Sequence, residues 1–302
     1  ANQLIAPFVR QFSITGQQLS ELPVPAKYLP MADQSSGIRN NLAFESLTLT
    51  PNQRFLYTAT ENALFQDGPQ ATLDDPSLSR ILKYDLSTGE PVAEFVYEVD
   101  EVPDEPDPAD GFATNGLVEL LALDNNGTFL ALERGFSLGA GNTVKLYQVN
   151  TQGALDVLGT PDLFREGAIE VDDEILPPGP FEIDPAVIKT ELLDIEADLG
   201  IEPDNLEGIA LGPVLPDGRQ SLVVVSANNF SPTQKTQFIA LALDLDTTPA
   251  ALPVVETPYT IDDNSFEEFE PLTILLVNDD GYEAAGIQAM YDALVAAGHI
   301  VT

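Results

Sequence analysis

The chain has 302 residues, 44% of them hydrophobic, which is enough to bury the core of one large or two ordinary domains. Its 49 acidic residues against 12 basic ones give a formal charge of -37, which argues against binding to nucleic-acid duplexes or anionic membrane surfaces. Cysteine is absent and His299 is the only histidine, so disulfides, thiolate metal sites and histidine-based triads are excluded within this sequence; no apolar run reaches the length of a membrane span.

Alternating apolar and polar residues, rich in β-branched and aromatic side chains, predict short strands rather than helices. Turn-forming residues such as Pro, Asn, Asp and Gly separate these segments. The predicted strands, in chain order, are 55–60, 80–86, 94–99, 143–149, 221–227 and 238–245. Short strands with frequent turns are typical of a sandwich, a barrel or a propeller.

A repeated unit favours the propeller. Segments 43–62, 117–135 and 205–229 each place a glutamate at the start of an apolar strand, followed by a polar turn, a second apolar strand and polar residues. Two more strands are predicted after each unit, which makes four, as in a propeller blade. These added strands are 80–86 with 93–99, 143–149 with 155–159, and 238–245 with 252–257. An incomplete unit over 6–22 precedes them.

Three acidic or proline-rich segments interrupt this pattern. Residues 100–111 predict an exposed loop, and residues 170–187 predict a long insertion between units. Residues 263–271 predict an acidic linker. Each is interpreted as a solvated segment in preference to a cation-binding one.

The glutamates that start the repeated units are the first candidate site. The innermost strands of propeller blades line a central channel, so Glu45, Glu119 and Glu207 are expected to meet near one mouth of it. Carboxylates that lie close together repel one another unless they are protonated or bridged by a cation. Calcium would relieve that repulsion and would also bind a substrate phosphate. The alternative is structural: these glutamates hydrogen-bond backbone groups between blades, and any calcium is structural too.

The polar residues that follow the second strand of each unit complete the candidate site. Arg134 is the main candidate for a phosphate clamp, because a guanidinium matches phosphate oxygens in a fork, and Arg39 is a weaker one. The remaining candidates are metal ligands: Glu61, Glu133, Asn228 and Asn229.

Most of residues 1–245 resemble the phytase-like, or esterase-like, family of secreted bacterial proteins. Segments 43–68, 119–136 and 205–238 carry the resemblance. It implies a β-propeller and the hydrolysis of phosphate or other esters. Members of the family usually carry more propeller sequence before the segment that opens this chain, so we expect a propeller that is incomplete at its N-terminus.

The last segment, 272–302, resembles the start of the SurE family of metal-dependent nucleotide phosphatases. It has an apolar strand, Asn-Asp-Asp-Gly, an amphipathic helix and the beginning of a second strand. The resemblance implies that Asp279 and Asp280 bind a divalent cation, Mg2+ or Mn2+. The other ligands of that family would lie beyond Thr302, so the nucleotidase domain is expected to be incomplete in this chain.

The sequence therefore predicts a mainly β fold: a propeller over 1–262, the linker 263–271, and a β-α-β start of an α/β domain over 272–302. The predicted function is that of a secreted bacterial, calcium-associated, phytase-like hydrolase acting on small phosphate esters, fused to a SurE-like phosphatase. The alternative is an extracellular, self-assembling propeller protein without catalytic activity, whose C-terminal strand makes subunit contacts.

Overall fold

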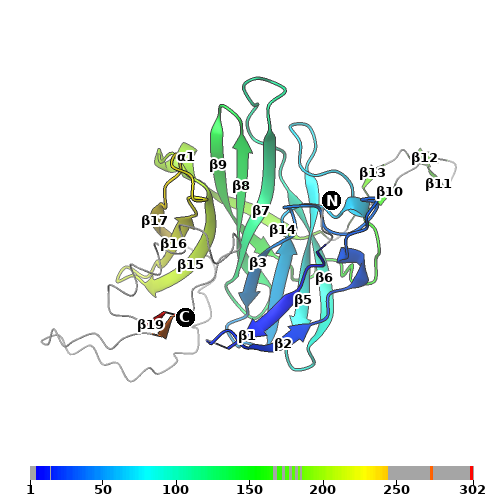
Figure 1. Ribbon diagram of the computed structural model, residues 1–302, viewed down its shortest axis with the longest axis horizontal. Helices are drawn as coiled ribbons and strands as arrows, with labels where there is room; N and C mark the ends of the chain where they lie inside the picture. Colours follow the sequence, from blue (N-terminus) through cyan, green and yellow to red (C-terminus); the bar gives the residue numbers. More distant parts are fainter. Residues whose placement is uncertain are drawn as a thin grey trace, which may run out of the picture.

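Antiparallel sheets dominate the regular secondary structure in the part of the chain that the computed structural model describes (Figure 1). The structure describes residues 5–13, 15–165, 169–171, 174–176, 179–180, 183, 186–243, 273–274 and 300–301. The first sheet has the order β3-β4-β5-β6: β3 (Phe44–Leu49), β4 (Phe55–Thr60), β5 (Ser77–Asp85) and β6 (Glu90–Val99). The second has the order β14-β9-β8-β7: β7 (Ala113–Ala122), β8 (Thr128–Ser137), β9 (Gly141–Asn150) and β14 (Ile188–Asp194). The third has the order β15-β16-β17: β15 (Leu206–Val214), β16 (Gln220–Ser226) and β17 (Phe238–Leu243).

Smaller elements surround these sheets. A hairpin of β1 (Val9–Phe12) and β2 (Gln18–Leu22) corresponds to the incomplete unit predicted over 6–22. The insertion after β9 contains two short pairs: β10 (Phe164–Arg165) with β13 (Gly179–Pro180), and β11 (Ile169–Val171) with β12 (Glu174–Leu176). The helices are η1 (Ala26–Tyr28), η2 (Phe65–Asp67) and α1 (Ile195–Leu199).

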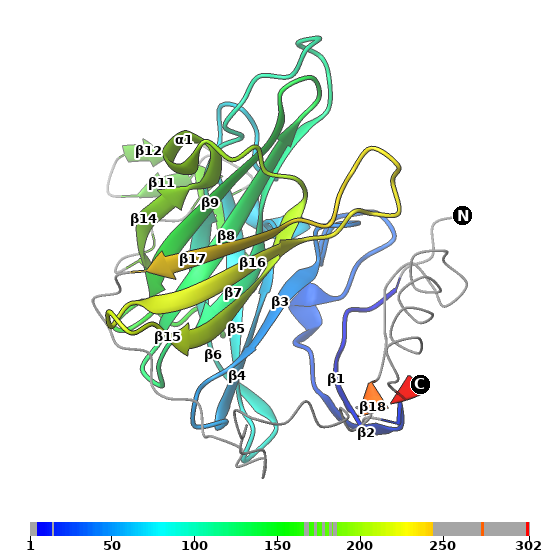
Figure 2. The ribbon, with the colours of Figure 1, turned by 90° about the vertical axis from the view of Figure 1, so that its left-hand side faces the viewer.

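The second sheet lies between the first and the third and buries both of its faces (Figures 1 and 2). Alternation along β8 shows how. Phe129 and Ala131 belong to the core shared with the first sheet, whereas Leu130 and Leu132 belong to the core shared with the third. Successive side chains of a strand point to opposite faces, so one apolar run serves two cores.

In each sheet, the strand that comes first in the chain is here called the first strand: β3, β7 and β15. These three strands are neighbours. β3 lies beside β7, and β7 lies beside β15. The backbone N–H of Ala122 in β7 donates to Thr48 Oγ1 in β3 at 3.0 Å, and the N–H of Leu117 donates to the carbonyl of Glu61 at 3.0 Å. Side chains from three sheets are thereby brought to one region of the molecule.

The fourth strand of the second sheet differs from the prediction. It is β14, which follows the insertion, and not 155–159. Residues 155–159 lie along the outer strand of the first sheet instead, where the N–H of Val157 donates to the carbonyl of Glu94 at 2.8 Å. The fourth strand predicted for the third sheet, 252–257, lies outside the described residues.

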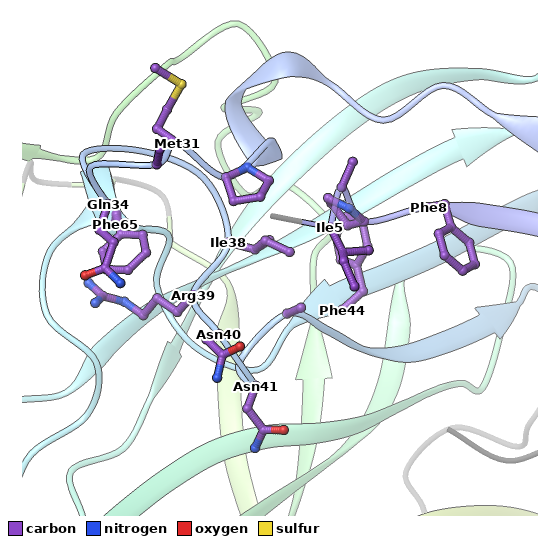
Figure 3. Close-up of a pocket in the computed structure, with 15 residues that line it drawn as sticks. Ile5, Phe8, Met31, Gln34, Ile38, Arg39, Asn40, Asn41, Phe44 and Phe65 are labelled. Carbon is purple, nitrogen blue, oxygen red and sulfur yellow. The ribbon is translucent and has the colours of Figure 1, made fainter. Parts of the chain in front are cut away.

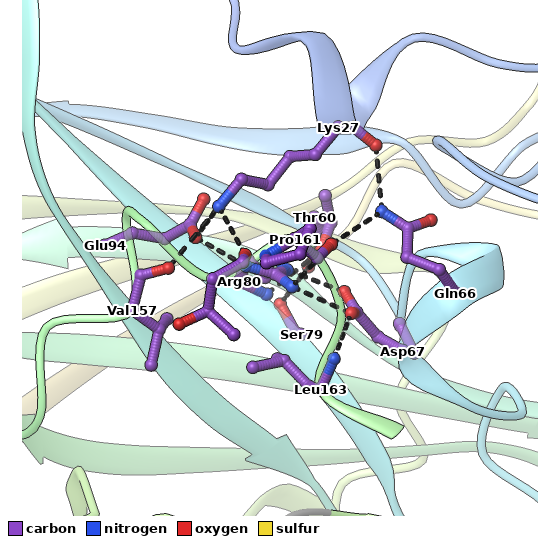
Figure 4. Close-up of polar contacts among 12 residues, drawn as sticks. Lys27, Thr60, Gln66, Asp67, Ser79, Arg80, Glu94, Val157, Pro161 and Leu163 are labelled. Carbon is purple, nitrogen blue, oxygen red and sulfur yellow. Dashed lines mark hydrogen bonds and ion pairs between the residues drawn. The ribbon is translucent and has the colours of Figure 1, made fainter. Parts of the chain in front are cut away.

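A buried charge network fixes the 157–163 loop against the first sheet (Figure 4). Arg80 is fully buried and donates to both carboxylate oxygens of Asp67, at 2.6 and 2.8 Å, and to Glu94 at 2.6 Å. Lys27 also donates to Glu94, at 2.8 Å, and the N–H of Leu163 donates to Asp67 at 2.9 Å. Two cations meet two carboxylates, so the buried charges compensate one another.

Near the C-terminus, β18 (Thr273–Ile274) and β19 (Ile300–Val301) pair in parallel. Most of the β-α-β start predicted over 272–302 lies outside the described residues. The linker 263–271 lies outside the described residues. Among the helices that the structure describes, none is both long and apolar enough to cross a membrane.

Candidate active site

The strands β3, β7 and β15 each carry a register shift, near the start of β3 and β15 and in the middle of β7. The shift falls at Glu45 in β3, at Val118 in β7 and at Glu207 in β15. A β-bulge of this kind re-aims a side chain and is common beside active sites. In the first and third sheets the re-aimed residue is a predicted glutamate. In the second sheet the predicted Glu119 comes one residue after the shift, so it is not the structural equivalent of the other two.

The Arg134 side chain lies between Glu61, which follows β4 of the first sheet, and Glu207 of the third sheet. Its Nη2 lies 3.1 Å from Glu207 Oε1 and 3.9 Å from Glu61 Oε1. The Glu61 side chain is only 6% exposed and that of Arg134 is 15% exposed, whereas that of Glu207 is 36% exposed. Arg134 Nε is buried without a hydrogen-bond partner among the described residues. The residues Glu45, Glu61, Glu119, Glu207 and Arg134 are called the Arg134 cluster below.

Gly116 makes room for the Glu61 carboxyl group. It is the direct strand partner of Arg134, in β7. A Cβ atom on Gly116 would lie 2.4 Å from Glu61 Cγ and 2.5 Å from Glu61 Oε1, so the Glu61 side chain would have to move. The side chain of Asn62 also donates to the carbonyl of Asn115, at 2.9 Å. Glu61 is therefore held against the backbone of β7, next to Arg134.

The pKa of Glu61 is raised from its ordinary 4.5 to about 8. Burial is the main cause, and repulsion from Glu45 and Glu207 adds to it. The attraction of Arg134 lowers the pKa, but at 3.9 Å it does not offset burial. Glu61 is accordingly a protonated acid at neutral pH.

The Glu119 carboxyl group accepts hydrogen bonds from the backbone of two strands. Burial raises its pKa to about 7, against the lowering effect of hydrogen bonds from the backbone of Leu120 and Leu47, and Glu45 raises the pKa further. The bond from the N–H of Leu120 measures 2.9 Å. Since Leu47 belongs to β3 and Leu120 to β7, Glu119 bridges two sheets, as the structural alternative predicts.

Glu133 does not join the cluster. Strand alternation in β8 places it on the face opposite to Arg134, towards the first sheet. There it accepts hydrogen bonds from Tyr97 Oη at 2.7 Å and from Asn115 Nδ2 at 3.0 Å, and it pairs with Lys189 at 2.5 Å. Its carboxylate oxygens are committed to this network. Burial raises the pKa of Glu133, and Lys189 opposes that effect.

The remaining predicted ligands lie elsewhere. Asn228 accepts from the N–H of Phe230 at 3.2 Å in the turn after β16, and Asn229 lies in the same turn with a φ of 46°. Asp279 and Asp280 fall outside the described residues.

Arg39 is also separate from the cluster. Its Nε donates to the carbonyl of Ala63 at 2.9 Å, and its Nη2 donates to the carbonyl of Gly68. Its guanidinium lies 4.4 Å from the ring centre of Phe65. It lines a pocket near the N-terminal segment instead.

The donor set of the Arg134 cluster does not form a ready calcium site. In the part of the chain that the structure describes, no three acidic or histidine side chains are arranged to hold a metal ion. Arg134 supplies the positive charge between Glu61 and Glu207. Calcium binding therefore stays a prediction.

Comparison with known families places the cluster within a recognised domain. The family model described as "Phytase-like: Esterase-like activity of phytase" matches residues 3–230, which include every residue of the Arg134 cluster. No curated protein matches the chain.

Proposed function

The chain belongs to the phytase-like family, and from this membership we propose that it is a hydrolase of phosphate esters with the Arg134 cluster as its active site. One observation carries the choice of site. Arg134 is held between carboxyl groups of two other sheets while its buried Nε has no partner among the described residues. A buried guanidinium N–H with no acceptor favours an anionic ligand, because leaving such a donor unpaired costs free energy.

The protonated Glu61 suits the role of general acid. Its pKa of about 8 means that it carries a proton at neutral pH and can give it to the oxygen of the leaving alcohol. Glu207 is the candidate general base, since its side chain is 36% exposed and water can reach it. Water attacks phosphorus, its proton passes to Glu207, the P–O bond to the alcohol breaks, and Glu61 protonates the alcohol oxygen. The products are the alcohol and phosphate. Glu207 then releases its proton to solvent and Glu61 takes up a proton from solvent, which restores both groups.

Protonation of Glu61 also reduces the electrostatic repulsion between the protein and a phosphate ester. The whole chain carries a formal charge of -37, which repels a phosphate group. Keeping Glu61 neutral leaves Arg134 with fewer competing carboxylates when the substrate arrives. No step of this mechanism uses a metal ion.

The test is hydrolysis of p-nitrophenyl phosphate and phytate by the whole chain, with p-nitrophenyl acetate as a carboxyl-ester comparison. We expect Arg134→Gln to lower kcat/KM for the phosphate esters by about 100-fold or more, as for the loss of a charge-stabilising donor. Arg219→Gln, at an exposed ion pair with Asp217, is the matched control and should leave the rate unchanged. If only p-nitrophenyl acetate were hydrolysed, the substrates of the protein would be carboxyl esters and not phosphate esters. If no ester were hydrolysed, the proposal would be refuted.

The architecture proposed for this function is a β-propeller. The first strands β3, β7 and β15 lie side by side and the sheets stack face to face, as blades do. Association with calcium and secretion from a bacterial cell are further proposals, which the acidic composition motivates. Isothermal titration with CaCl2 tests the first; the absence of any binding at millimolar calcium would refute it.

A SurE-like start over 272–302 is likewise a proposal. It rests on Asn-Asp-Asp-Gly after an apolar strand and agrees with the parallel pairing of β18 and β19. Asp279 and Asp280 would hold Mg2+ or Mn2+ there. Titration of the chain and of Asp280→Asn with MnCl2 tests it, and equal Mn2+ binding by both would refute it.

A further inference from the structure

A pocket of about 590 Å³ lies where the segment before β1 faces the loop over 30–41 and the start of β3 (Figure 3). Its larger apolar lining side chains are Ile5, Phe8, Met31, Ile38, Phe44 and Phe65. Three of these side chains are well exposed, Ile5 at 65%, Phe8 at 50% and Met31 at 52%. The volume is that of a small-molecule site, and the apolar walls are open to solvent.

Arg39 is the charged group of this wall. Figure 3 shows it beside Phe65, on the side of the pocket opposite to Ile5 and Phe8. Its hydrogen bonds to two backbone carbonyls and its stacking on Phe65 fix the guanidinium in place. These partners are neutral, so they position the charge without compensating it.

Arg39 has no ion pair within 4.0 Å among the described residues, in a chain with 49 acidic and 12 basic residues. Asp67, which acts on it electrostatically, is itself held by Arg80 at 2.6 Å. Burial lowers the pKa of Arg39, as expected for a charge removed from water without an acidic partner. A fixed, uncompensated guanidinium at the wall of an apolar pocket is complementary to an anion that carries an apolar body.

We propose that this pocket binds a small organic anion, with its carboxylate, sulfonate or phosphate group on Arg39 and its hydrocarbon or aromatic body against Ile5, Phe8 and Ile38. Gln34 and Asn40 line the same pocket and supply amide donors to the anionic group. The site is independent of ester hydrolysis, because it uses no residue of the Arg134 cluster.

The experiment uses two fluorescent probes on the full chain: anionic 8-anilinonaphthalene-1-sulfonate and neutral N-phenyl-1-naphthylamine. We expect saturable binding of the anionic probe to the wild type, and a loss of about tenfold in affinity for Arg39→Met, the size of one charge-assisted hydrogen bond. The neutral probe should bind both proteins alike. Lys83→Met is the matched control. Like Arg39, Lys83 stacks on an aromatic ring, 4.0 Å from the centre of Phe55, and has no ion pair within 4.0 Å among the described residues. Unlike Arg39, it lies outside the pocket lining.

A second variant guards against misfolding of Arg39→Met. Met31→Glu adds a negative charge to an exposed part of the lining and should weaken only the anionic probe. Equal weakening by Lys83→Met would mean general attraction of anions and would overturn the proposal. Absence of saturable binding, or an equal dependence of the neutral probe on Arg39, would overturn it as well. Unchanged binding of the anionic probe by Met31→Glu would place the probe elsewhere and would also refute it.

Discussion

Replacing Glu61 by glutamine should change how the stability of the protein depends on pH. The carboxyl group of Glu61 ionises at about 8 in the folded chain, whereas an exposed glutamate ionises at 4.5. Between these values the folded protein keeps a proton that the unfolded chain has lost. The free energy of unfolding therefore falls as pH rises from 4.5 to about 8 and is level beyond that. Glutamine has nearly the same shape and cannot ionise, so Glu61→Gln should lose this dependence.

The size of the effect follows from the pKa difference. From 4.5 to about 8 is about 3.5 pKa units, and each unit corresponds to ~1.4 kcal/mol, which gives about 5 kcal/mol as an upper bound. Solvent screening reduces this little, because the side chain is only 6% exposed. Relative to the wild type, the variant should gain up to about 4 kcal/mol of stability on going from pH 5 to pH 9, because the first part of the titration lies below pH 5.

The measurement is urea unfolding of both proteins at several pH values between 5 and 9. The difference between them is the quantity of interest, since the titration of the other acidic groups cancels in it. Any constant change in hydrogen bonding to Arg134 shifts the two curves apart but does not alter their relative slope. Parallel curves across the whole range would show that Glu61 is not held protonated, and the proposed general acid would be lost with it.

Three other predictions concern activity and stability. The rate of phosphate-ester hydrolysis should fall as pH rises through about 8, where Glu61 loses its proton. Glu61→Gln should show a low rate at every pH, without this fall. A pH–rate profile that is the same in both proteins would contradict the role of Glu61 as general acid. Gly116→Ala should displace the Glu61 carboxyl group and lower kcat/KM by about tenfold or more. Gly135→Ala, whose Cβ would meet Pro103 Cδ at 2.8 Å, should leave kcat/KM unchanged. Equal losses in the two variants would mean that a general defect of the strands, and not displacement of Glu61, lowers the activity. Arg80→Met should cost about 3–5 kcal/mol in urea unfolding because it leaves the buried Asp67 without its cation, while Glu94 keeps its pair with Lys27. Arg54→Met, at a pair with Asp85 in which the arginine is 59% exposed, should cost less than about 1 kcal/mol. Similar costs for the two variants would contradict the reasoning.

The strands of the three sheets could largely be predicted from short segments rich in β-branched and aromatic residues between turns. Where both faces of a sheet are buried, as at 129–132, the segment is a continuous apolar run. The fourth strand of the second sheet could not. β14 is mostly exposed and shows no clear alternation, so its pairing with β9 depends on tertiary contacts. The more apolar segment 155–159 resembles a strand in sequence, yet it covers the first sheet, where Glu94 and Lys27 bind its backbone.

The residues of the Arg134 cluster could largely be predicted from the sequence, but their arrangement in space could not. Glutamates at the starts of strands and Arg134 after a second strand mark the region, and the structure brings them together. The sequence does not reveal which of two successive residues, Glu133 or Arg134, faces the cluster, because residues 129–132 are apolar on both faces and do not indicate which face lies towards which sheet. Nor does it reveal Gly116, whose importance lies only in the space it leaves for Glu61.

The same scarcity of basic residues shapes both proposed sites. With 12 basic side chains against 49 acidic ones, a cation is costly to leave uncompensated and most are held in ion pairs, as Arg80 is by Asp67 and Glu94. Arg134 keeps a buried donor without a partner among the described residues, and Arg39 keeps a guanidinium fixed by neutral groups only. In an acidic chain these are the positions where an anion gains most from binding. The raised pKa of Glu61 adds to the first of them, since a carboxyl group that stays protonated lets a phosphate approach a region that is otherwise rich in negative charge.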